Sequence, residues 1–477
     1  MDESLHAEAE QLLLQLPFSV EMPAGTGKTQ LVAAMAGVAA ESGGTSLILT
    51  HTNAGVTALR KRLKAFGIPQ KMVHVDTIAS WAFELVRHYP DLAGTRIAAV
   101  PDWTKTAEYV TGAVNVGRSH AIKRMHAASF DYMFVDEYQD CNLNQHALIL
   151  EIAAAITKSA VFGDRLQGIF DFANETLVDW DEHVFPNYPL IDREHVPWRW
   201  TGHNAELGQW LLDLRPQLVP GATVDLSQLS IPGLAWQATS HQAISTAAYA
   251  VRTFDESVLI LNQWRGDNAK TAVRLGGAYT VMEDINGRFM HDSLTALESS
   301  EPSEYALWLA RFAKECFSGF GEINQPVLRR LVRGETFDGL DRPGFESTLS
   351  ALETLIANPS LANLVVAMKA IESAKEGKLC CNEAWRDTLA AIEAVVLNPG
   401  DSMRDNLSMI RDRLRYTGRK RHQRVVSRTL LVKGLEYDHA ILCDADNIGS
   451  VRNFYVAITR PRKTLTILSR SPLIRLR

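Results

Sequence analysis

A glycine-rich turn near the N-terminus carries residue types that could bind a polyphosphate. Residues 22–29 read Met-Pro-Ala-Gly-Thr-Gly-Lys-Thr and follow an apolar run from Pro17 to Val20. Backbone N–H groups freed by the glycines can surround phosphate oxygens, the lysine supplies a positive charge, and the final threonine can ligate Mg²⁺. A small residue is usual at the first position, where this chain has Met22, and an ordinary turn before a helix is the alternative. The pattern predicts a strand, a P-loop and a helix.

Two acids and a glutamine follow later apolar runs. Asp136 and Glu137 come directly after the run 131–135, and Gln167 follows the run 160–162. One carboxylate can hold hydrated magnesium, and the next can orient or deprotonate a water molecule. A loop of solvated acids is the alternative. Because the carboxyl ends of parallel strands meet at one edge of a sheet, these stretches together predict a site that hydrolyses a nucleoside triphosphate.

Apolar and helical patterns predict an α/β fold with two lobes, each built on a parallel sheet. The predicted strands of the first lobe all end in polar or glycine-rich residues, as strands do where a ligand lies at the carboxyl edge. The predicted boundaries are 1–82 and 129–190 for the first lobe, 83–128 for a small helical insertion, 191–294 and 417–477 for the second lobe, and 295–416 for its helical insertion. Strands in the second lobe are predicted near 257–262, 278–282, 425–431, 439–444 and 465–468.

Charge is informative only by segment. The 477 residues carry 49 Lys and Arg against 55 Asp and Glu, a net charge of −6, which argues against a surface built as a whole to bind polyanions. Two segments are basic: a predicted helix over 54–66, and the run 411–424 with seven basic residues against one acid. For each segment, a nucleic-acid contact and a solvated charged face are the alternatives.

Neither a membrane segment nor an export signal is predicted. The N-terminus lacks a basic region followed by an apolar core, and no apolar run approaches the length of about eighteen residues that a membrane span requires. The five cysteines are odd in number and lack the two-residue spacing of metal ligands, which predicts reduced thiols. We expect a soluble, cytoplasmic protein without a membrane partner.

Six short stretches along the chain form an ordered set. They are Ala24–Thr29, Thr50–Asn53, Asp136–Asp140, Gly163–Phe170, Lys433–Glu436 and Tyr455–Arg460. In type and order they resemble the helicase motifs of the UvrD/PcrA/Rep branch of superfamily 1, and the Asp-Glu-x-Gln-Asp and Tyr-Val-x-x-Thr-Arg patterns are specific to that branch. The resemblance implies two RecA-like lobes with helical insertions, and ATP and Mg²⁺ as cofactors.

The resemblance also implies a role for each matching position. Nucleotide contacts would come from Gln11, Ala24, Gly25, Thr26, Gly27, Lys28, Thr29, Trp198 and Glu436. Mg²⁺ would be held by Thr29 and Asp136, and catalysis would use Glu137, Gln167 and the arginine fingers Arg199 and Arg460. Single-stranded DNA would be contacted by Thr52, Asn53, Thr77 and Phe172, although Phe172 could instead be a core residue.

The activity that the resemblance implies is ATP-dependent movement from 3' to 5' along single-stranded DNA, with unwinding of a tailed duplex, in repair or antiphage defence. The compact build is also similar to the helicase subunit of Gabija-type antiphage systems, which works beside an OLD-family nuclease. The family usually has threonine and histidine where this chain has Arg428 and Leu430, and often arginine where it has Ala173. The alternative is therefore a DNA-activated ATPase that senses DNA ends and regulates a partner nuclease without processive unwinding.

Overall fold

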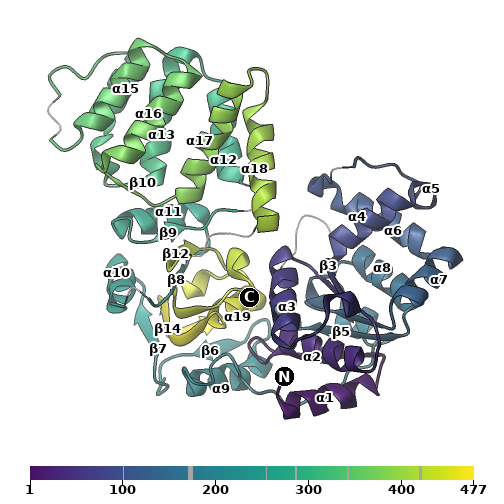
Figure 1. Cartoon of the computed structure of the whole chain (residues 1–477). Coiled ribbons are helices and arrows are strands. Elements are labelled where there is room, and N and C mark those ends of the chain that lie inside the picture. Colours follow the sequence, from purple (N-terminus) through teal and green to yellow (C-terminus); the bar gives the residue numbers. More distant parts are fainter. Residues whose placement is uncertain (100, 170–175, 254, 285–286, 341–342, 418–421) are drawn as a thin grey trace. The chain divides into compact units, whose positions relative to one another are not determined.

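The computed structural model describes residues 1–99, 101–169, 176–253, 255–284, 287–340, 343–417 and 422–477 (Figure 1). The chain divides into two compact units. The first unit holds residues 1–222, 449–459 and 477, and the second holds 223–448 and 460–476. The lobe boundaries predicted from the sequence stay a prediction. Among the described residues, no helix combines the length and the apolar character needed to cross a membrane.

The first unit is built on a five-stranded sheet in the order β1-β5-β4-β2-β3, with all neighbours parallel. The strands are β1 (Phe18–Glu21), β2 (Ser46–Thr50), β3 (Val73–Thr77), β4 (Tyr132–Val135) and β5 (Lys158–Gly163). The P-loop follows β1, and the two acids follow β4. β5 lies between these two strands, so the loop after β5 begins between the P-loop and the acids. The predicted parallel sheet is confirmed.

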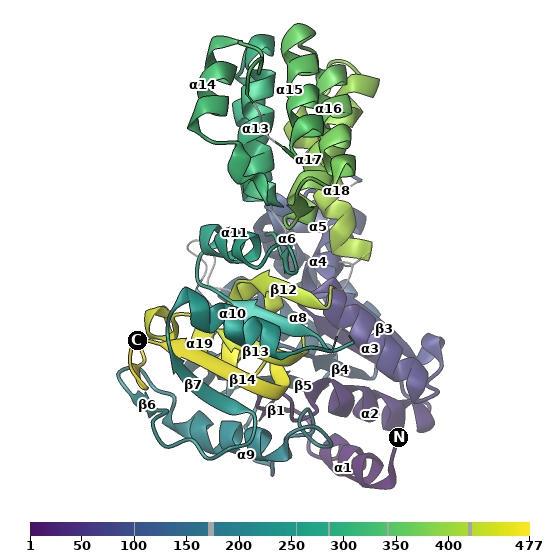
Figure 2. The same ribbon diagram turned by 90° about the vertical axis from the view of Figure 1, so that its left-hand side faces the viewer.

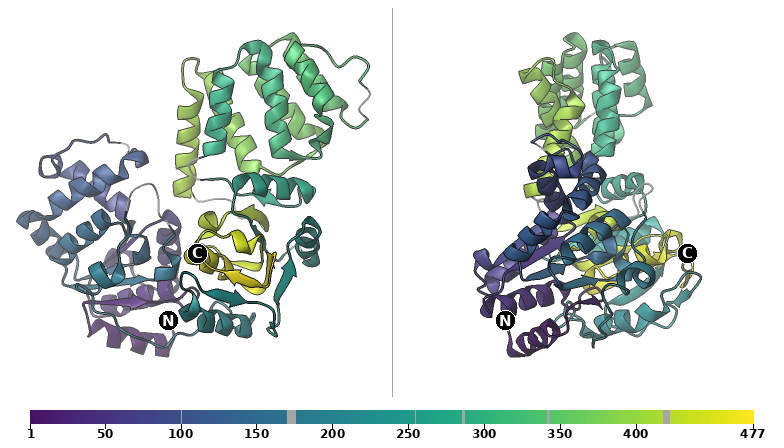
Figure 3. Two further views of the ribbon diagram at one scale, coloured as in Figure 1. Left: turned by 180° about the vertical axis from the view of Figure 1, so that it is seen from behind. Right: turned by 90° about the vertical axis from the view of Figure 1, so that its right-hand side faces the viewer.

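Helices cover both faces of this sheet (Figure 3). Alternate strand residues point to opposite faces, so Ile48 and Phe134 belong to one apolar core while Leu47 and Met133 belong to the other. The first core is closed by α1 (Glu3–Leu13), α2 (Lys28–Glu41) and α3 (Asn53–Ala65). The second is closed by α4 (Ile78–His88), α6 (Thr106–Gly117), α7 (His120–Ser129) and α8 (Leu143–Ala153).

The stretch 83–128, expected as an insertion, takes part in the core of the first unit. Its helices are most of α4, then α5 (Pro90–Ala93), α6 and most of α7. Phe83 and Val110 belong to the same apolar core as Leu47 and Met133 of the sheet. This stretch therefore covers one face of the sheet and shares a core with it.

The second unit has a six-stranded parallel sheet in the order β7-β14-β13-β8-β12-β9. Its strands are β7 (Leu234–Ala238), β8 (Val258–Leu261), β9 (Thr280–Val281), β12 (Arg424–Ser427), β13 (Tyr437–Leu442) and β14 (Pro461–Ser469). Two short antiparallel pairs join β6 (Thr223–Asp225) to β15 (Leu473–Arg475) and β10 (Phe317–Ser318) to β11 (Lys378–Leu379). The predicted strand over 425–431 is too long, because Thr429–Val432 forms a 3-10 turn in which Leu431 N donates to Arg428 O at 3.1 Å.

Helices dominate the rest of the second unit (Figure 2). They are α10 (His241–Ala250), α11 (Arg265–Arg274), α12 (Arg288–Glu298), α13 (Tyr305–Cys316), α14 (Gln325–Arg333), α15 (Glu346–Ala357), α16 (Leu361–Ala374), α17 (Asn382–Leu397) and α18 (Met403–Thr417). Phe312 stacks between Trp308 and Trp385, with ring centroids 5.1 and 5.6 Å away. The same apolar core includes Val258 and Ile260 of β8, so sheet and helices are joined by one core.

All five cysteines lie at described positions, where they are buried and free of disulfide bonds.

The burial of His126 predicts a pH-dependent stability of the first unit. Its side chain is 1% exposed and lies 5.8 Å from the Trp81 ring, between centroids. Burial lowers the pKa of His126 from 6.5 to about 4. Since the folded-state pKa is depressed, the stabilisation is complete above the unfolded pKa of about 6.5 and is lost as the pH falls toward 4.

We expect His126→Leu to remove this pH dependence. Between pH 7 and pH 5 the parent should lose about 2 kcal/mol more unfolding free energy than the variant does. Urea denaturation at the two pH values measures the difference. His120→Leu, at an exposed position on the same helix, is the matched control, and an equal effect of both substitutions would contradict burial as the cause.

Candidate functional site

The turn between β1 and α2 has the backbone of a phosphate-binding loop. Gly25 has φ 76° and Gly27 has φ 92°, a left-handed region that residues with a Cβ adopt at a cost. A Cβ on Gly25 would also lie 2.6 Å from the Trp200 ring. The Thr26 hydroxyl donates to Pro23 O at 2.7 Å and fixes the turn from within. Both glycines are therefore required by the local backbone.

Lys28 is buried against the two acids that follow β4. Its Nζ lies 2.7 Å from Glu137 Oε2 and 3.7 Å from Asp136 Oδ1, and its side chain is 8% exposed. Burial lowers the pKa of Lys28, but the nearby Glu137 and Asp136 outweigh it and the pKa is raised overall. Burial raises the pKa of Asp136 to about 6, although Lys28 opposes that rise. Lys28 and the two acids are more than a hundred positions apart in the sequence. The structure brings them together, as the predicted site requires.

Thr29 and Asp136 form an oxygen pair beside this lysine. The Thr29 hydroxyl donates to Asp136 Oδ2 at 3.2 Å. Hydroxyl and carboxylate oxygens are the ligands that Mg²⁺ prefers, usually with water completing its coordination shell. The two residues therefore fit the magnesium site that the resemblance implies.

Gln139 connects the ends of β4 and β5. Its amide nitrogen donates to the Glu137 carboxylate, and its amide oxygen accepts from Asp164 N at 2.9 Å. Asp164 Oδ2 in turn accepts from Gln167 Nε2 at 2.9 Å. Glu137 itself has φ 59°, an uncommon conformation for a residue with a side chain, of the kind found at functional sites. The predicted catalytic residues Glu137 and Gln167 thus belong to one hydrogen-bonded network.

Arg215 anchors this network from a distant part of the sequence. Its Nη2 lies 2.7 Å from Asp164 Oδ1, and it also pairs with Glu21 at the end of β1. The Tyr455 ring on α19 (Val451–Ile458) lies 6.0 Å from the Arg215 guanidinium, and the Tyr455 hydroxyl accepts from Ala24 N at 3.1 Å. Sequence reasoning assigned no role to these residues. Tyr455 lies in a quoted motif, whereas Arg215 and Glu21 have no local signal.

The turn containing Trp198, Arg199 and Trp200 lies directly against the P-loop. Arg199 N donates to Gly25 O at 3.0 Å, and Arg199 Nη1 donates to Thr459 O at 2.6 Å. A Cβ on Gly27 would lie 3.3 Å from Trp198 Cδ1. Trp198 is nevertheless 59% exposed, so its indole has a face available for stacking beside the loop.

Three further residues predicted to bind nucleotide or act in catalysis belong to α1 and to the second unit. Gln11 is exposed on α1. Glu436 is exposed just before β13, and Arg460 is fully buried just before β14 with its Nη1 donating to Leu435 O at 3.2 Å. Glu436 and Arg460 belong to the second unit.

Three of the four residues predicted to contact DNA lie at the carboxyl ends of β2 and β3. Thr52 is exposed and caps α3 by accepting from Gly55 N at 3.0 Å, and Asn53 begins that helix. Thr77 is 5% exposed, and its hydroxyl caps α4 by accepting from Ser80 N at 3.0 Å. Thr77 is therefore engaged in positioning α4. Phe172 and Ala173 lie outside the described residues.

The unusual Arg428 has an ion-pair partner within the second unit. Its Nη2 pairs with Asp284, which follows β9, and Leu430 lies in the adjacent 3-10 turn. From the basic run 411–424, Arg411 is 3% exposed and pairs with Glu383 and Asp387 at 3.0 and 2.7 Å. These arginines form internal contacts of the second unit.

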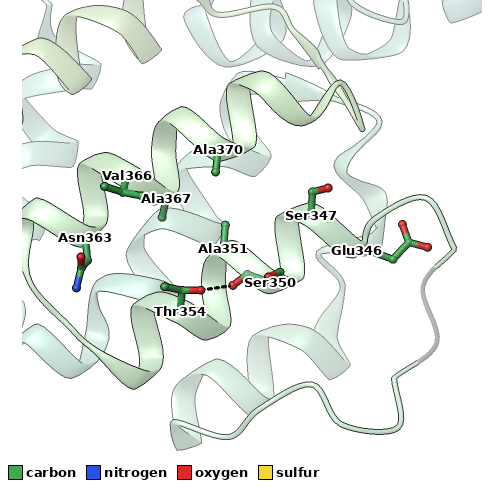
Figure 4. Close-up of a pocket in the computed structure, with 9 residues that line it drawn as sticks. All are labelled: Glu346, Ser347, Ser350, Ala351, Thr354, Asn363, Val366, Ala367 and Ala370. Carbon is green, nitrogen blue, oxygen red and sulfur yellow. Dashed lines mark hydrogen bonds between the residues drawn. The ribbon is translucent and has the colours of Figure 1, made fainter.

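A groove of about 450 Å³ lies between α15 and α16 (Figure 4). Its lining is mostly small side chains, Glu346 is its one charged residue, and the Thr354 hydroxyl donates to Ser350 O at 2.9 Å. The groove lacks the convergent charges found around Lys28.

The fold and this site together define a class. Parallel sheets, a glycine loop that opens a helix, and paired acids at the end of another strand of the same sheet are the architecture of P-loop nucleoside triphosphatases. A family model described as the UvrD/REP helicase N-terminal domain matches residues 103–177. This stretch of the chain is therefore similar to the N-terminal domain of UvrD/REP helicases.

One solved helicase structure is similar to part of this chain at low sequence identity. The crystal structure of Pif1 helicase from Candida albicans is similar at 13% sequence identity with a TM-score of 0.30. The alignment covers 53% of this chain and 55% of that one, about half of each length. A likeness this low carries no argument about function. No curated protein sequence matches the chain.

We expect Arg215→Ala to destabilise the first unit by about 3 kcal/mol, because it leaves a buried carboxylate without its cation. Asp164 is fully buried, whereas Arg215 is 19% exposed. Arg165→Ala is the matched control. That arginine also pairs with Glu21, at 3.0 Å, but is 41% exposed, and its loss should cost about 0–1 kcal/mol. Urea denaturation of both variants measures the difference, and equal losses would contradict the role of burial.

Proposed function

We propose that this protein is an ATP-dependent DNA motor that moves from 3' to 5' on single-stranded DNA and separates tailed duplexes. The observation that carries the proposal is the placement of Lys28, Thr29, Asp136, Glu137 and Gln167 around one edge of a parallel sheet. The direction of movement and the choice of ATP rest on the family resemblance. The family match over 103–177 supports a helicase as the general class.

Each residue of the site has a chemical task in this proposal. The P-loop amides and the Lys28 ammonium bind the phosphate chain, where the lysine charge offsets that of the outer phosphates. Thr29 and Asp136 hold Mg²⁺, which when bound neutralises charge on the phosphates. Glu137 orients the attacking water and accepts its proton, and Gln167 contacts the γ-phosphate. The side chain of Gln139 holds Glu137 and Asp164 in fixed positions by hydrogen-bonding to both.

The remaining nucleotide roles follow the family. Trp198 stacks on the adenine, Gln11 reads its edge and Glu436 binds the ribose. Arg199 and Arg460 act as arginine fingers, groups that in related phosphoryl transfer raise the rate by about 10³ to 10⁵. The contact of Arg199 with the Gly25 carbonyl supports a place for Arg199 beside the loop.

DNA is bound through its backbone in this proposal. Thr52 and Asn53 lie at the exposed end of β2 and contact the strand there, with Thr77 at the end of β3 and Phe172 as a stacking residue. Backbone and stacking contacts tolerate any base sequence, which suits a protein that must move over all of them. Single-stranded or tailed duplex DNA is accordingly the proposed substrate, in repair or in antiphage defence.

A second candidate function is a DNA-activated ATPase that senses DNA ends and regulates a partner, for which an OLD-family nuclease is the proposed class. The observation in its favour is the Arg428–Asp284 ion pair. Arg428 stands where the family uses residues that couple to DNA, and here its guanidinium binds an internal carboxylate. Such a protein would turn over ATP without separating strands.

We expect single-stranded DNA to raise the ATP turnover of the parent many-fold, and Glu137→Gln to lower kcat by at least about 100-fold through loss of the general base. ATP hydrolysis with and without oligo-dT measures both. Glu182→Gln, an exposed acid of the first unit, is the matched control and should keep parental turnover. Hydrolysis that persists in Glu137→Gln would rule out the assigned base.

Strand displacement separates the two candidate functions. We expect the parent to displace the strand of a 3'-tailed duplex and to leave a 5'-tailed duplex intact, because movement from 3' to 5' requires a 3' tail for loading. Displacement on the 5'-tailed substrate alone would reverse the proposed direction. DNA-stimulated ATP turnover without displacement on either substrate would favour the sensor.

A further inference from the structure

Helix α3 belongs to a segment with a one-sided charge. From residue 42 to residue 75 the chain has no Asp or Glu and five Lys or Arg. The whole chain has a net charge of −6, so the positive charge of this segment is opposite in sign to the net charge of the protein. The cations are Arg60, Lys61, Arg62, Lys64 and Lys71. Four of them lie within five consecutive positions of α3.

The packing of α3 leaves most of these cations in solvent. Its apolar side chains Leu59 and Leu63 are buried against the sheet. Lys61, Arg62 and Lys64 are exposed, and within the described part of the chain no carboxylate lies at ion-pair distance from any of them. We call these three residues the basic face of α3. α3 packs against β3, the edge strand of the sheet (Figure 2).

The helix dipole accounts for Arg62 and Lys64, which lie in the last turn of α3, but not for Lys61, which precedes that turn. Cations near the carboxyl end of a helix gain about 0.3–1 kcal/mol each from the helix dipole at low salt. Like charges three or four positions apart, such as Lys61 and Lys64, cost a few tenths of a kcal/mol when no acid separates them. Arg60 has a structural task, since its Nη2 donates to Val75 O at 2.7 Å. Lys61, Arg62 and Lys64 make no such bond to any residue that the structure describes, so their charge is available to an external anion.

We infer that the basic face of α3 binds the sugar–phosphate backbone of DNA and extends the binding track beyond Thr52 and Asn53. This inference rests on the proposed function and deepens it by naming a second binding surface. A helix rises about 1.5 Å per residue, so Lys61 and Lys64 lie about 12 and 16 Å along the axis from Asn53.

Nucleic acid suits this surface better than other anions do. The face begins on the same helix that Thr52 caps and Asn53 opens, so a strand bound at the end of β2 passes next to it. Three uncompensated cations on a short face provide charge without a shaped pocket, which matches a repeating phosphate backbone. We therefore expect binding by this face to be independent of base sequence.

The test is the salt dependence of DNA binding. In the variant Lys61→Gln, Arg62→Gln, Lys64→Gln, each new residue has a helix propensity close to that of the old one, so the thermal midpoint should stay parental. Each neutralised phosphate of single-stranded DNA contributes about 0.7 to the slope of log Kobs against log salt. We therefore expect the slope for labelled oligo-dT between 50 and 200 mM NaCl to become shallower by about 2.

A matched control carries the same change of charge at another place on the first unit. Arg96, Lys105 and Arg118 are exposed there, and the variant with all three replaced by Gln should keep the parental slope. An equal loss of slope in both variants would show a general charge effect and overturn the inference. A parental slope in the α3 variant would also overturn it.

The outcome for the parent separates the inference from the proposed function. A parent that fails to bind oligo-dT at any salt concentration would overturn both. A parent that binds with a steep slope, together with an α3 variant of the same slope, would overturn only the role of the basic face. If that variant instead lost binding to phosphatidylserine vesicles, the face would be a contact for anionic lipid, and the inference would be wrong.

Discussion

The buried charge of Lys28 is the constraint on which the candidate site depends. A cation removed from water is tolerated only with a partner, and Lys28 has one in Glu137 at 2.7 Å. The lysine opens α2 after β1, while Glu137 follows β4, with β5 between these strands. The pairing therefore requires that three strand ends meet at one edge of the sheet. The loop after β5 brings Asp164 and Gln167 to the same edge.

Asp164 links the carboxyl edge of the first sheet to the C-terminal part of the chain, because its partner Arg215 lies against the Tyr455 ring. It is fully buried and accepts hydrogen bonds from Gln167, Leu166 and Arg215. Tyr455 contacts the same region, and the segment 449–459 that carries it belongs to the first unit although the strands before and after it belong to the second. The motif 455–460 is thus divided, with Tyr455 in the first unit and Arg460 in the second.

Local pattern was enough to predict the sheet of the first unit, the P-loop, and the acids at the end of β4. Each of these depends on a run of neighbouring residues whose types have one clear structural use. Arg215 and Glu21 were missed because their importance lies in a contact across 194 positions, which no local pattern encodes. The strand β7 was missed because Leu234 is the only buried residue among its five. The end of β12 was misplaced because Leu430 and Leu431 are apolar without being in a strand.

The two basic segments show why charge runs need a structure to be interpreted. Arg411 is directed inward onto Glu383 and Asp387, and Arg424 donates to the Tyr279 hydroxyl at 3.2 Å and to Val251 O at 2.7 Å. These arginines use their charge and their donors to hold the second unit together. The basic face of α3 has the same residue types but apolar packing beneath it and solvent around its charges. The two segments have similar amino-acid composition. What distinguishes arginines that stabilise the interior of a unit from a surface that can attract an external polyanion is the position of the nearest hydrogen-bond acceptor.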